Sequence, residues 1–296
     1  MGKPTFLVIG GQKCGTTSIY RYLDEHPDVF TGPVKELRFF SGESASQEAA
    51  PTNGPLISNF KAYCDYFERG TKYQAAGEAS PSYIFYPGTA ERIHQYLPDV
   101  QIIAILRDPV DRAFSEYWHH WRMGRQLDDD FLSFVRSEEV DAVPQFGDLR
   151  DCVRRGLYYR QLKPYFRLFD RRRLLILFHE DLKSSAQELM QRVYEFVGVD
   201  LEFEPKTTRA HNRGKMPETD WKYTFAQMIE RCIDWSPLEE STRMKYRRQV
   251  RRGIQAKRKA PPVEVRQELI PLFEEDIRKL ESLVGRDLTR WTTVKT

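Results

Sequence analysis

A short stretch near the start of the chain constrains the fold most. Residues 6–9 form a continuous apolar run, Phe-Leu-Val-Ile, which is typical of a strand buried on both faces of a sheet. Glycines at positions 10, 11 and 15 follow, and they let the backbone turn tightly and approach a ligand. Residues 16–23 then predict a helix. A strand, a glycine loop and a helix in this order predict an α/β fold with a mainly parallel central sheet flanked by helices.

The loop at the start of this helix is suited to an anion. The first N–H groups of the helix lack partners within it, and the helix dipole, three hydroxyls at 16–18 and Lys13 all favour negative charge. A standard kinase loop, G-x-x-x-x-G-K-[ST], has its lysine directly after the second glycine. Thr16 occupies that position here, and the cation is Lys13 inside the loop. The loop therefore predicts a phosphate-like ligand held by another route, or, as the simpler alternative, a glycine turn with a surface lysine.

The bulk composition bounds the class of protein. The 296 residues are 40% hydrophobic and 30% charged, which is enough for one large α/β domain, and we predict a single domain spanning 1–296. The net charge of +3 does not indicate a nucleic-acid partner. The four cysteines are widely spaced, and neither a signal segment nor a membrane-length apolar run is found. We therefore expect a reduced, cytoplasmic protein with no membrane span.

A second phosphate site is predicted at the end of the clearest strand, residues 100–106. Arg107 follows this strand, at the edge where open α/β sheets bind ligands. Ser115 lies two turns into the next helix, and an arginine and a serine so placed can hold a phosphate together. The alternative for Arg107 alone is a salt-bridged arginine at a strand end.

These segments resemble the sulfotransferases that use 3′-phosphoadenosine 5′-phosphosulfate (PAPS). The sequence Gly-Gln-Lys-Cys-Gly-Thr-Thr-Ser at 11–18 resembles their 5′-phosphosulfate loop, closest to the heparan sulfate sulfotransferases and their bacterial relatives. The sequence Leu-Arg-Asp-Pro-x-x-Arg-Ala-x-Ser at 106–115 resembles their 3′-phosphate motif. Lys-Glu-x-x-Phe-Phe at 35–40 resembles the segment that carries their catalytic base. The resemblance runs from about residue 5 to 291 and implies a P-loop-like sulfotransferase fold.

The resemblance implies a set of site residues and a reaction. Lys13 and Glu36 would be catalytic, Glu36 as general base and Lys13 on the bridging oxygen of the leaving group. The co-substrate would be PAPS, no metal would be needed, and the acceptor would carry a free hydroxyl or, as second choice, an amine, on a glycan, lipid or small metabolite. The residues implied to bind PAPS are Gly11, Gln12, Lys13, Cys14, Gly15, Thr16, Thr17, Ser18, Arg107, Ser115, Tyr158, Arg213, Gly214 and Lys215.

Two positions depart from the heparan sulfate branch. Some relatives have a substrate-contacting histidine where this chain has Arg38, and several have a lysine where it has Ala79. The heparan sulfate acceptor contacts are therefore not carried over. Glu78 is either a second base or a paired structural carboxylate, and we favour the structural role.

Other functions stay open. A P-loop kinase or NTPase would need a lysine after Gly15 and a metal-binding acid, for which the pair Glu180 and Asp181 is the nearest match. We favour a cap at Asp181 instead, at the start of a helix expected over 183–198. A non-catalytic nucleotide- or polyanion-binding protein would use the basic stretch 243–259 and ignore Glu36. That stretch equally fits a solvated helix face.

Overall fold

The computed structural model describes most of the chain. The described residues are 1–32, 34–42, 57, 59–125, 130–137, 151–205, 215–217, 220–253, 255–257 and 260–294, and side chains are not described at 215–217, 220–225, 227, 253 and 255–257. No helix in these ranges is both long enough and apolar enough to cross a membrane.

A five-stranded sheet lies at the centre, and all of its strand pairs are parallel. The strands are, in spatial order, β2 (Val29–Phe30), β3 (Ala75–Ala79), β1 (Phe6–Gly10), β4 (Gln101–Leu106) and β5 (Leu174–Phe178). After β1 the chain forms β2 and β3 on one side of it, and then β4 and β5 on the other side. The strand order therefore reverses at β1. Ligands of open α/β sheets bind outside the carboxyl end of the strand at such a reversal. The predicted parallel α/β architecture is confirmed.

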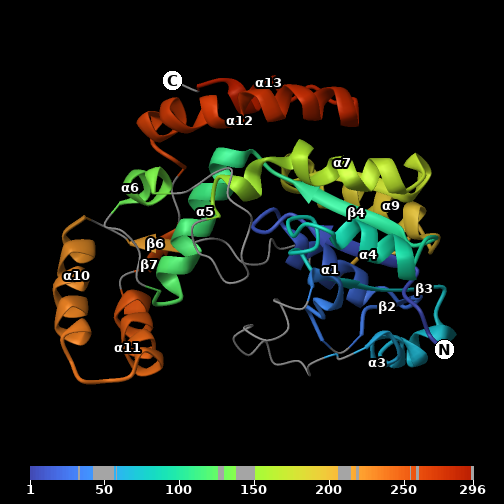
Figure 1. Cartoon of the computed structure of the whole chain (residues 1–296), viewed down its shortest axis with the longest axis horizontal. Coiled ribbons are helices and arrows are strands. Elements are labelled where there is room, and N and C mark those ends of the chain that lie inside the picture. Colours follow the sequence, from blue (N-terminus) through green and yellow to red (C-terminus); the bar gives the residue numbers. More distant parts are fainter. Residues whose placement is uncertain are drawn as a thin grey trace.

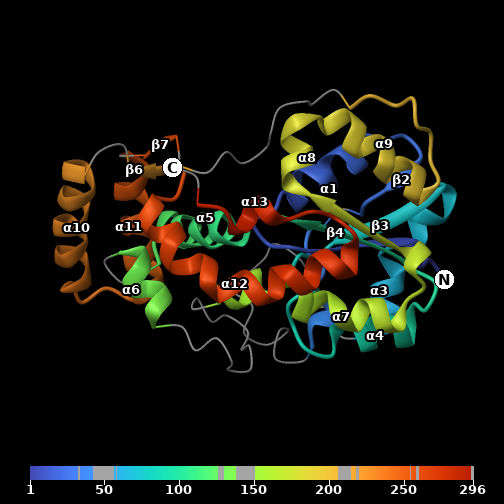
Figure 2. The same ribbon diagram turned by 90° about the horizontal axis from the view of Figure 1, so that it is seen from above.

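Helices cover both faces of this sheet, as Figure 2 shows. On one side lie α1 (Thr16–Glu25), α8 (His179–Ser184) and α9 (Ala186–Val197), and on the other lie α4 (Thr89–Tyr96) and α7 (Tyr158–Leu168). The long α12 (Val263–Val284) packs on α7 and on α5 (Pro109–Arg122). The remaining α-helices of the described chain are α3 (Phe60–Asp65), α6 (Phe131–Arg136), α10 (Asp220–Asp234), α11 (Glu240–Gly253) and α13 (Thr289–Thr292).

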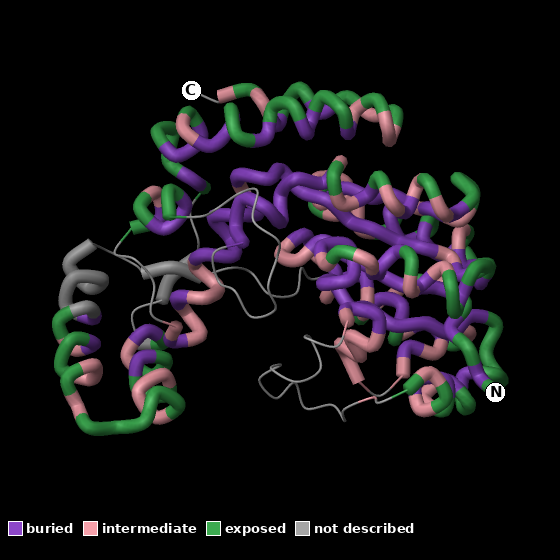
Figure 3. The backbone as a smooth tube through the Cα atoms, in the orientation of Figure 1, coloured by how far each residue is buried: buried purple, intermediate pink, exposed green. Residues whose placement is uncertain are grey.

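The apolar strands form the core, and α10 and α11 stand apart from it. All five residues of β1 are buried, as are 102–106 in β4, which explains why both strands read as unbroken apolar runs (Figure 3). In Figure 1, α10 and α11 lie at the end of the molecule away from the sheet, and α11 packs on α5. The short strands β6 (Lys215–Pro217) and β7 (Gln255–Lys257), which precede and follow these two helices, pair as a two-stranded antiparallel sheet.

Asp276 connects the long helix α12 to the start of α7. Its carboxylate, on α12, accepts the N–H groups of Tyr159 (2.8 Å) and Arg160 (3.2 Å), which are free donors at the start of α7. The side chain caps a helix from more than a hundred residues further along the chain. Burial raises the pKa of Asp276 to about 6, from an ordinary value of 3.8.

We expect this shift to make stability depend on pH. Because the pKa of Asp276 is higher in the folded chain than in the unfolded chain, the folded state binds the proton more tightly between pH 3.8 and about 6. Its contribution to the free energy of unfolding is therefore greatest below this window and is lost as pH rises through it. Within this window, Asp276→Asn should change the slope of the free energy of unfolding against pH by up to about 1.4 kcal/mol per pH unit. Urea unfolding from pH 4.5 to 7.5 measures this, with the exposed Glu274→Gln on the same helix as control. Parallel curves for wild type and Asp276→Asn would contradict the assignment.

Candidate functional site

The glycine loop turns at the carboxyl end of β1, in the middle of the sheet. The Gly11 N–H donates to the carbonyl of Ile105 on β4 at 2.7 Å, which fixes the start of the loop against the neighbouring strand. Gly10 has φ +157°, and a Cβ there would lie 2.4 Å from the Ile84 side chain. Gly15 has φ +112°, and a Cβ there would lie 2.9 Å from the Leu182 side chain. Glycine is therefore required at both ends of the loop.

The loop leads into the start of α1, where backbone N–H groups face the candidate site without partners within the helix. Gly15 is the N-cap residue and supplies no side chain to cap the helix. Among the described residues, no hydrogen-bond partner is found for the N–H groups of Thr16 and Thr17, whereas the N–H of Ser18 bonds to the Gly15 carbonyl at 2.9 Å. Free N–H groups at the positive end of a helix dipole form an anion site.

Arg107 reaches this loop from the neighbouring strand. Its guanidinium donates to the carbonyl of Lys13 at 3.3 Å, and the residue is only 5% exposed. A second contact, to Asp111, is long at 3.5 Å, and Asp111 is held more closely by Arg266 at 2.6 Å. Within the described chain the buried Nε of Arg107 has no hydrogen-bond partner. A buried donor without a partner is costly, and a ligand oxygen would satisfy it.

Ser115 lies in α5, two turns from its first residue, and is 9% exposed. The structure thus places Arg107 against the loop and Ser115 on the helix that follows directly. Contact of either with a 3′-phosphate stays a prediction.

Tyr158 lies beneath the loop. It is fully buried, and its hydroxyl donates to the Arg107 carbonyl at 2.9 Å and lies 3.5 Å from the Cys14 sulfur. Burial raises the pKa of the Cys14 thiol to about 11, so this thiol is neutral at pH 7. Through these contacts Tyr158 links the loop to the end of β4, which is a structural role. Its position does not support direct contact with the adenine of PAPS.

Glu36 lies in a segment that follows β2 at the edge of the sheet. One carboxylate oxygen accepts two bonds from the Arg38 guanidinium, at 2.8 and 3.0 Å, and the other lies 3.4 Å from the Lys35 ammonium. The side chain is 19% exposed. A carboxylate has about four acceptor positions, so a further proton donor can still reach Glu36.

The buried carboxylate of Glu78 bonds to the backbone of the segment that carries Glu36. It is 1% exposed and accepts bonds from the Ser80, Tyr83 and Tyr63 hydroxyls at 2.6, 2.7 and 3.0 Å. It also accepts the Leu37 N–H at 3.3 Å, one residue after Glu36. Burial raises the pKa of Glu78. A carboxylate with four donors around it is placed to hold the backbone of the segment, which supports the structural role over that of a second base.

Comparison with known proteins fits this geometry. A family model described as "Sulfotransferase domain" matches residues 3–281. The chain belongs to this family. A crystal structure of a sulfotransferase from Alicyclobacillus acidocaldarius matches with a TM-score of 0.73 and 29% identity, covering 99% of this chain and 100% of that one. The predicted family and fold are confirmed.

Two curated relatives match only part of their length. Bifunctional heparan sulfate N-deacetylase/N-sulfotransferase 4 from Mus musculus is 30% identical over 212 residues, which are 66% of this chain and 22% of that protein. Membrane-associated sulfotransferase kil1 from Dictyostelium discoideum is 37% identical over 166 residues, which are 53% of this chain and 31% of that protein. The chain spans about a fifth of the length of the mouse relative that it matches.

Sequence reasoning did not single out a histidine that lies near the candidate site. His119 lies one helical turn after Ser115 on α5, with its Nδ1 3.2 Å from the Arg122 guanidinium. Burial and then the charge of Lys13 lower the pKa of His119 to about 2, so the imidazole is neutral at pH 7. The spacing of Ser115, His119 and Arg122, by four and then three residues, places them on one helix face and could have identified it.

The acidic pair after β5 is occupied by the C-terminal segment. Asp181 pairs with Arg286 at 2.5 and 2.7 Å, and Glu180 accepts from the Trp291 indole at 3.3 Å. The expectation that Asp181 caps a helix over 183–198 is wrong. The chain breaks there into α8 and α9, and Ser185 caps α9 by accepting the Glu188 N–H at 3.3 Å.

The last three residues that the resemblance implies as PAPS contacts lie mostly outside the described residues. Arg213 and Gly214 are not among them, and of Lys215 only the backbone is described, at the start of β6. Their contact with PAPS stays a prediction.

The basic stretch is only partly available to a ligand. Arg247 and Arg251 on α11 are buried and pair with Asp234, Glu240 and Glu230. They also bond to carbonyls at the end of α5, those of Gly124 and Trp121. The exposed cations Lys245, Arg248 and Arg252 lie on the other face, and the described residues form no ion pair with them. Two of the cations in this stretch, Arg247 and Arg251, therefore have a structural role.

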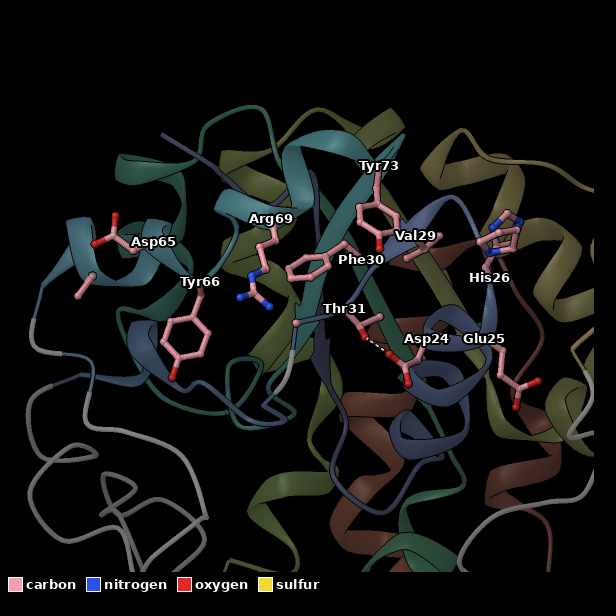
Figure 4. Close-up of a pocket in the computed structure, with 13 residues that line it drawn as sticks. Asp24, Glu25, His26, Val29, Phe30, Thr31, Asp65, Tyr66, Arg69 and Tyr73 are labelled. Atoms are coloured by element: carbon pink, nitrogen blue, oxygen red, sulfur yellow. Dashed lines mark hydrogen bonds between the residues drawn. The ribbon is translucent and has the colours of Figure 1, made fainter.

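A cavity of about 820 Å³ lies elsewhere, beside β2. Figure 4 shows its walls, which come from the end of α1, from β2, from α3 and from the turn before β3, with Arg69 pointing in between Phe30 and Tyr66. None of the predicted site residues lines it.

Proposed function

We propose that this sulfotransferase takes PAPS as co-substrate and transfers its sulfuryl group to an acceptor hydroxyl by in-line displacement. One observation carries the proposal. The anion loop and Arg107 meet, through the bond from the guanidinium to the Lys13 carbonyl, and the buried Nε beside that bond has no described partner. A nucleotide with anionic groups at both its 5′ and 3′ positions fits two such neighbouring sites.

The mechanism follows from the residues around these sites. Glu36 takes the proton of the acceptor O–H as the oxygen forms its bond to sulfur. The bond between sulfur and the 5′-phosphate oxygen breaks, and its electron pair leaves with 3′-phosphoadenosine 5′-phosphate (PAP). Lys13 and the N–H groups at the start of α1 stabilise the charge that grows on that oxygen.

The surroundings of Glu36 favour a hydroxyl over an amine. The Arg38 and Lys35 cations lie 2.8 and 3.4 Å from its carboxylate and would repel an ammonium group. The mouse relative is named as a heparan sulfate N-sulfotransferase. Because this chain has Arg38 and Ala79 at positions where that branch contacts its acceptor, we propose an acceptor other than heparan sulfate, on a glycan, lipid or small metabolite.

Calorimetric titration tests the co-substrate. Wild type should bind PAP much more tightly than 5′-ADP or ATP. Arg107→Ala should weaken PAP binding about 10- to 100-fold, as expected for a lost charge-assisted bond, and leave 5′-ADP binding nearly unchanged. The control is Arg278→Ala, an exposed arginine on α12. Equal affinity of wild type for PAP and ADP would refute the proposed 3′-phosphate site. The loop would then be interpreted as that of a kinase or of a nucleotide-binding protein without transfer activity.

A further inference from the structure

Arg155 is a buried cation that touches the anion loop from a distant part of the chain. It is 8% exposed, and its guanidinium donates to the side-chain oxygen of Gln12 at 3.0 Å. Gln12 is the residue directly before Lys13. The contact joins two residues 143 positions apart.

Arg155 is itself held on several sides. Its guanidinium lies 4.1 Å from the centre of the Phe85 ring, in the turn after β3. Its nitrogens lie 3.3 Å from Asp151 and 3.5 Å from Glu116 on α5, and Glu116 in turn pairs with Arg112 at 2.5 Å. A guanidinium fixed by stacking and by two carboxylates has little freedom to follow a mobile partner. It therefore imposes its position on Gln12.

The chemistry of this pair decides which way the amide of Gln12 points. A guanidinium has donors only, so it can bond to the amide oxygen and not to the amide nitrogen. The amide is planar, and its NH₂ group must therefore point away from Arg155. The residue is half-buried, and no described residue bonds to that NH₂ group.

We infer that Arg155 is a positioning residue, which turns the Gln12 amide so that its NH₂ group donates to the sulfuryl oxygens of PAPS. The inference rests on the proposed function. The NH₂ group adds hydrogen bonds without adding charge, so it orients the sulfuryl group beside Lys13 and leaves the stabilisation of charge to the lysine. No bond forms or breaks at Gln12 or Arg155.

Gln12→Glu separates this role from a structural one. The new carboxylate has the same shape and pairs better with Arg155, so the melting temperature should stay the same or rise. It also places an anionic oxygen where the donor group was. Affinity for PAPS should fall about 10- to 100-fold, and affinity for PAP, which lacks the sulfuryl group, should fall by a much smaller factor. Gln12→Met removes the donor without adding charge and should shift the PAPS-to-PAP affinity ratio in the same direction.

The role of Arg155 is tested by a double-mutant cycle. Arg155→Lys should lower the rate of PAP release from PAPS, and Gln12→Met should have little further effect in that background. Arg154→Lys is the matched control, because Arg154 is equally buried and also pairs with Asp151 but does not bond to Gln12. It should leave the PAPS-to-PAP affinity ratio unchanged.

The outcomes separate the two proposals. If wild type binds PAP and PAPS, and the Gln12 variants weaken both equally or not at all, the orientation of the amide has no role and the inference is overturned alone. If wild type binds neither nucleotide, the proposed function fails, and the inference fails with it.

Discussion

Replacing Lys13 with methionine is expected to lower the rate of PAP release from PAPS by about 10³-fold or more. The lysine would stabilise the charge that develops on the leaving oxygen, and the methionine keeps the length of the side chain without the cation. The loop itself should survive, because Arg107 bonds to the backbone carbonyl at position 13 and not to the side chain. PAP binding should weaken far less than the rate.

Single-turnover release of PAP measures the effect, with an acceptor from a screen or with water as the default acceptor. Lys163→Met, at an exposed lysine on α7, is the control. A Lys13→Met variant that releases PAP at the rate of wild type would exclude Lys13 as a catalytic residue.

Glu36→Gln should lower kcat with an acceptor by about 10²- to 10⁴-fold, the range expected when a general base is lost. The amide keeps an oxygen that can accept from Arg38, which holds the carboxylate at 2.8 Å in wild type, so the segment should keep its position. PAP affinity should not change, because the variant affects the acceptor side of the reaction.

Glu78→Gln provides the contrast. Four donors surround that carboxylate, and an amide NH₂ group in their midst would leave some of them without acceptors, so its main effect should be on the free energy of unfolding. A Glu36→Gln variant with normal kcat, or a Glu78→Gln variant that folds normally and loses turnover, would reverse the two roles.

The strands and the loop could be predicted from the sequence because their determinants are local. An unbroken apolar run predicts a strand buried on both faces, and β1, β4 and β5 each have one. Gly285 has φ +69° and ends α12, as a glycine in the left-handed region commonly does. Gly10 and Gly15 mark two positions in the loop where a side chain would be strained.

Features that depend on distant contacts could not be predicted in this way. The bond from Arg155 to Gln12 crosses 143 positions, and nothing in either local sequence indicates it. The cations of α11 look equivalent in the sequence, yet Arg247 and Arg251 are buried and paired, whereas Lys245 is exposed. That difference arises because α11 packs on α5, and the register of that packing is set by the whole fold. The break at Ser185 was missed because two short helices in succession have nearly the pattern of one.

The buried hydroxyl of Tyr158 bears on how the chain selects a ligand. It bonds to the Arg107 carbonyl at the end of β4 and lies 3.5 Å from Cys14 in the glycine loop. A single buried phenol group therefore helps to fix the distance between the two proposed anion sites before any ligand binds. We expect such a chain to select a molecule by the distance between its charged ends, because little conformational entropy is lost when a molecule of the right length binds to sites already in place.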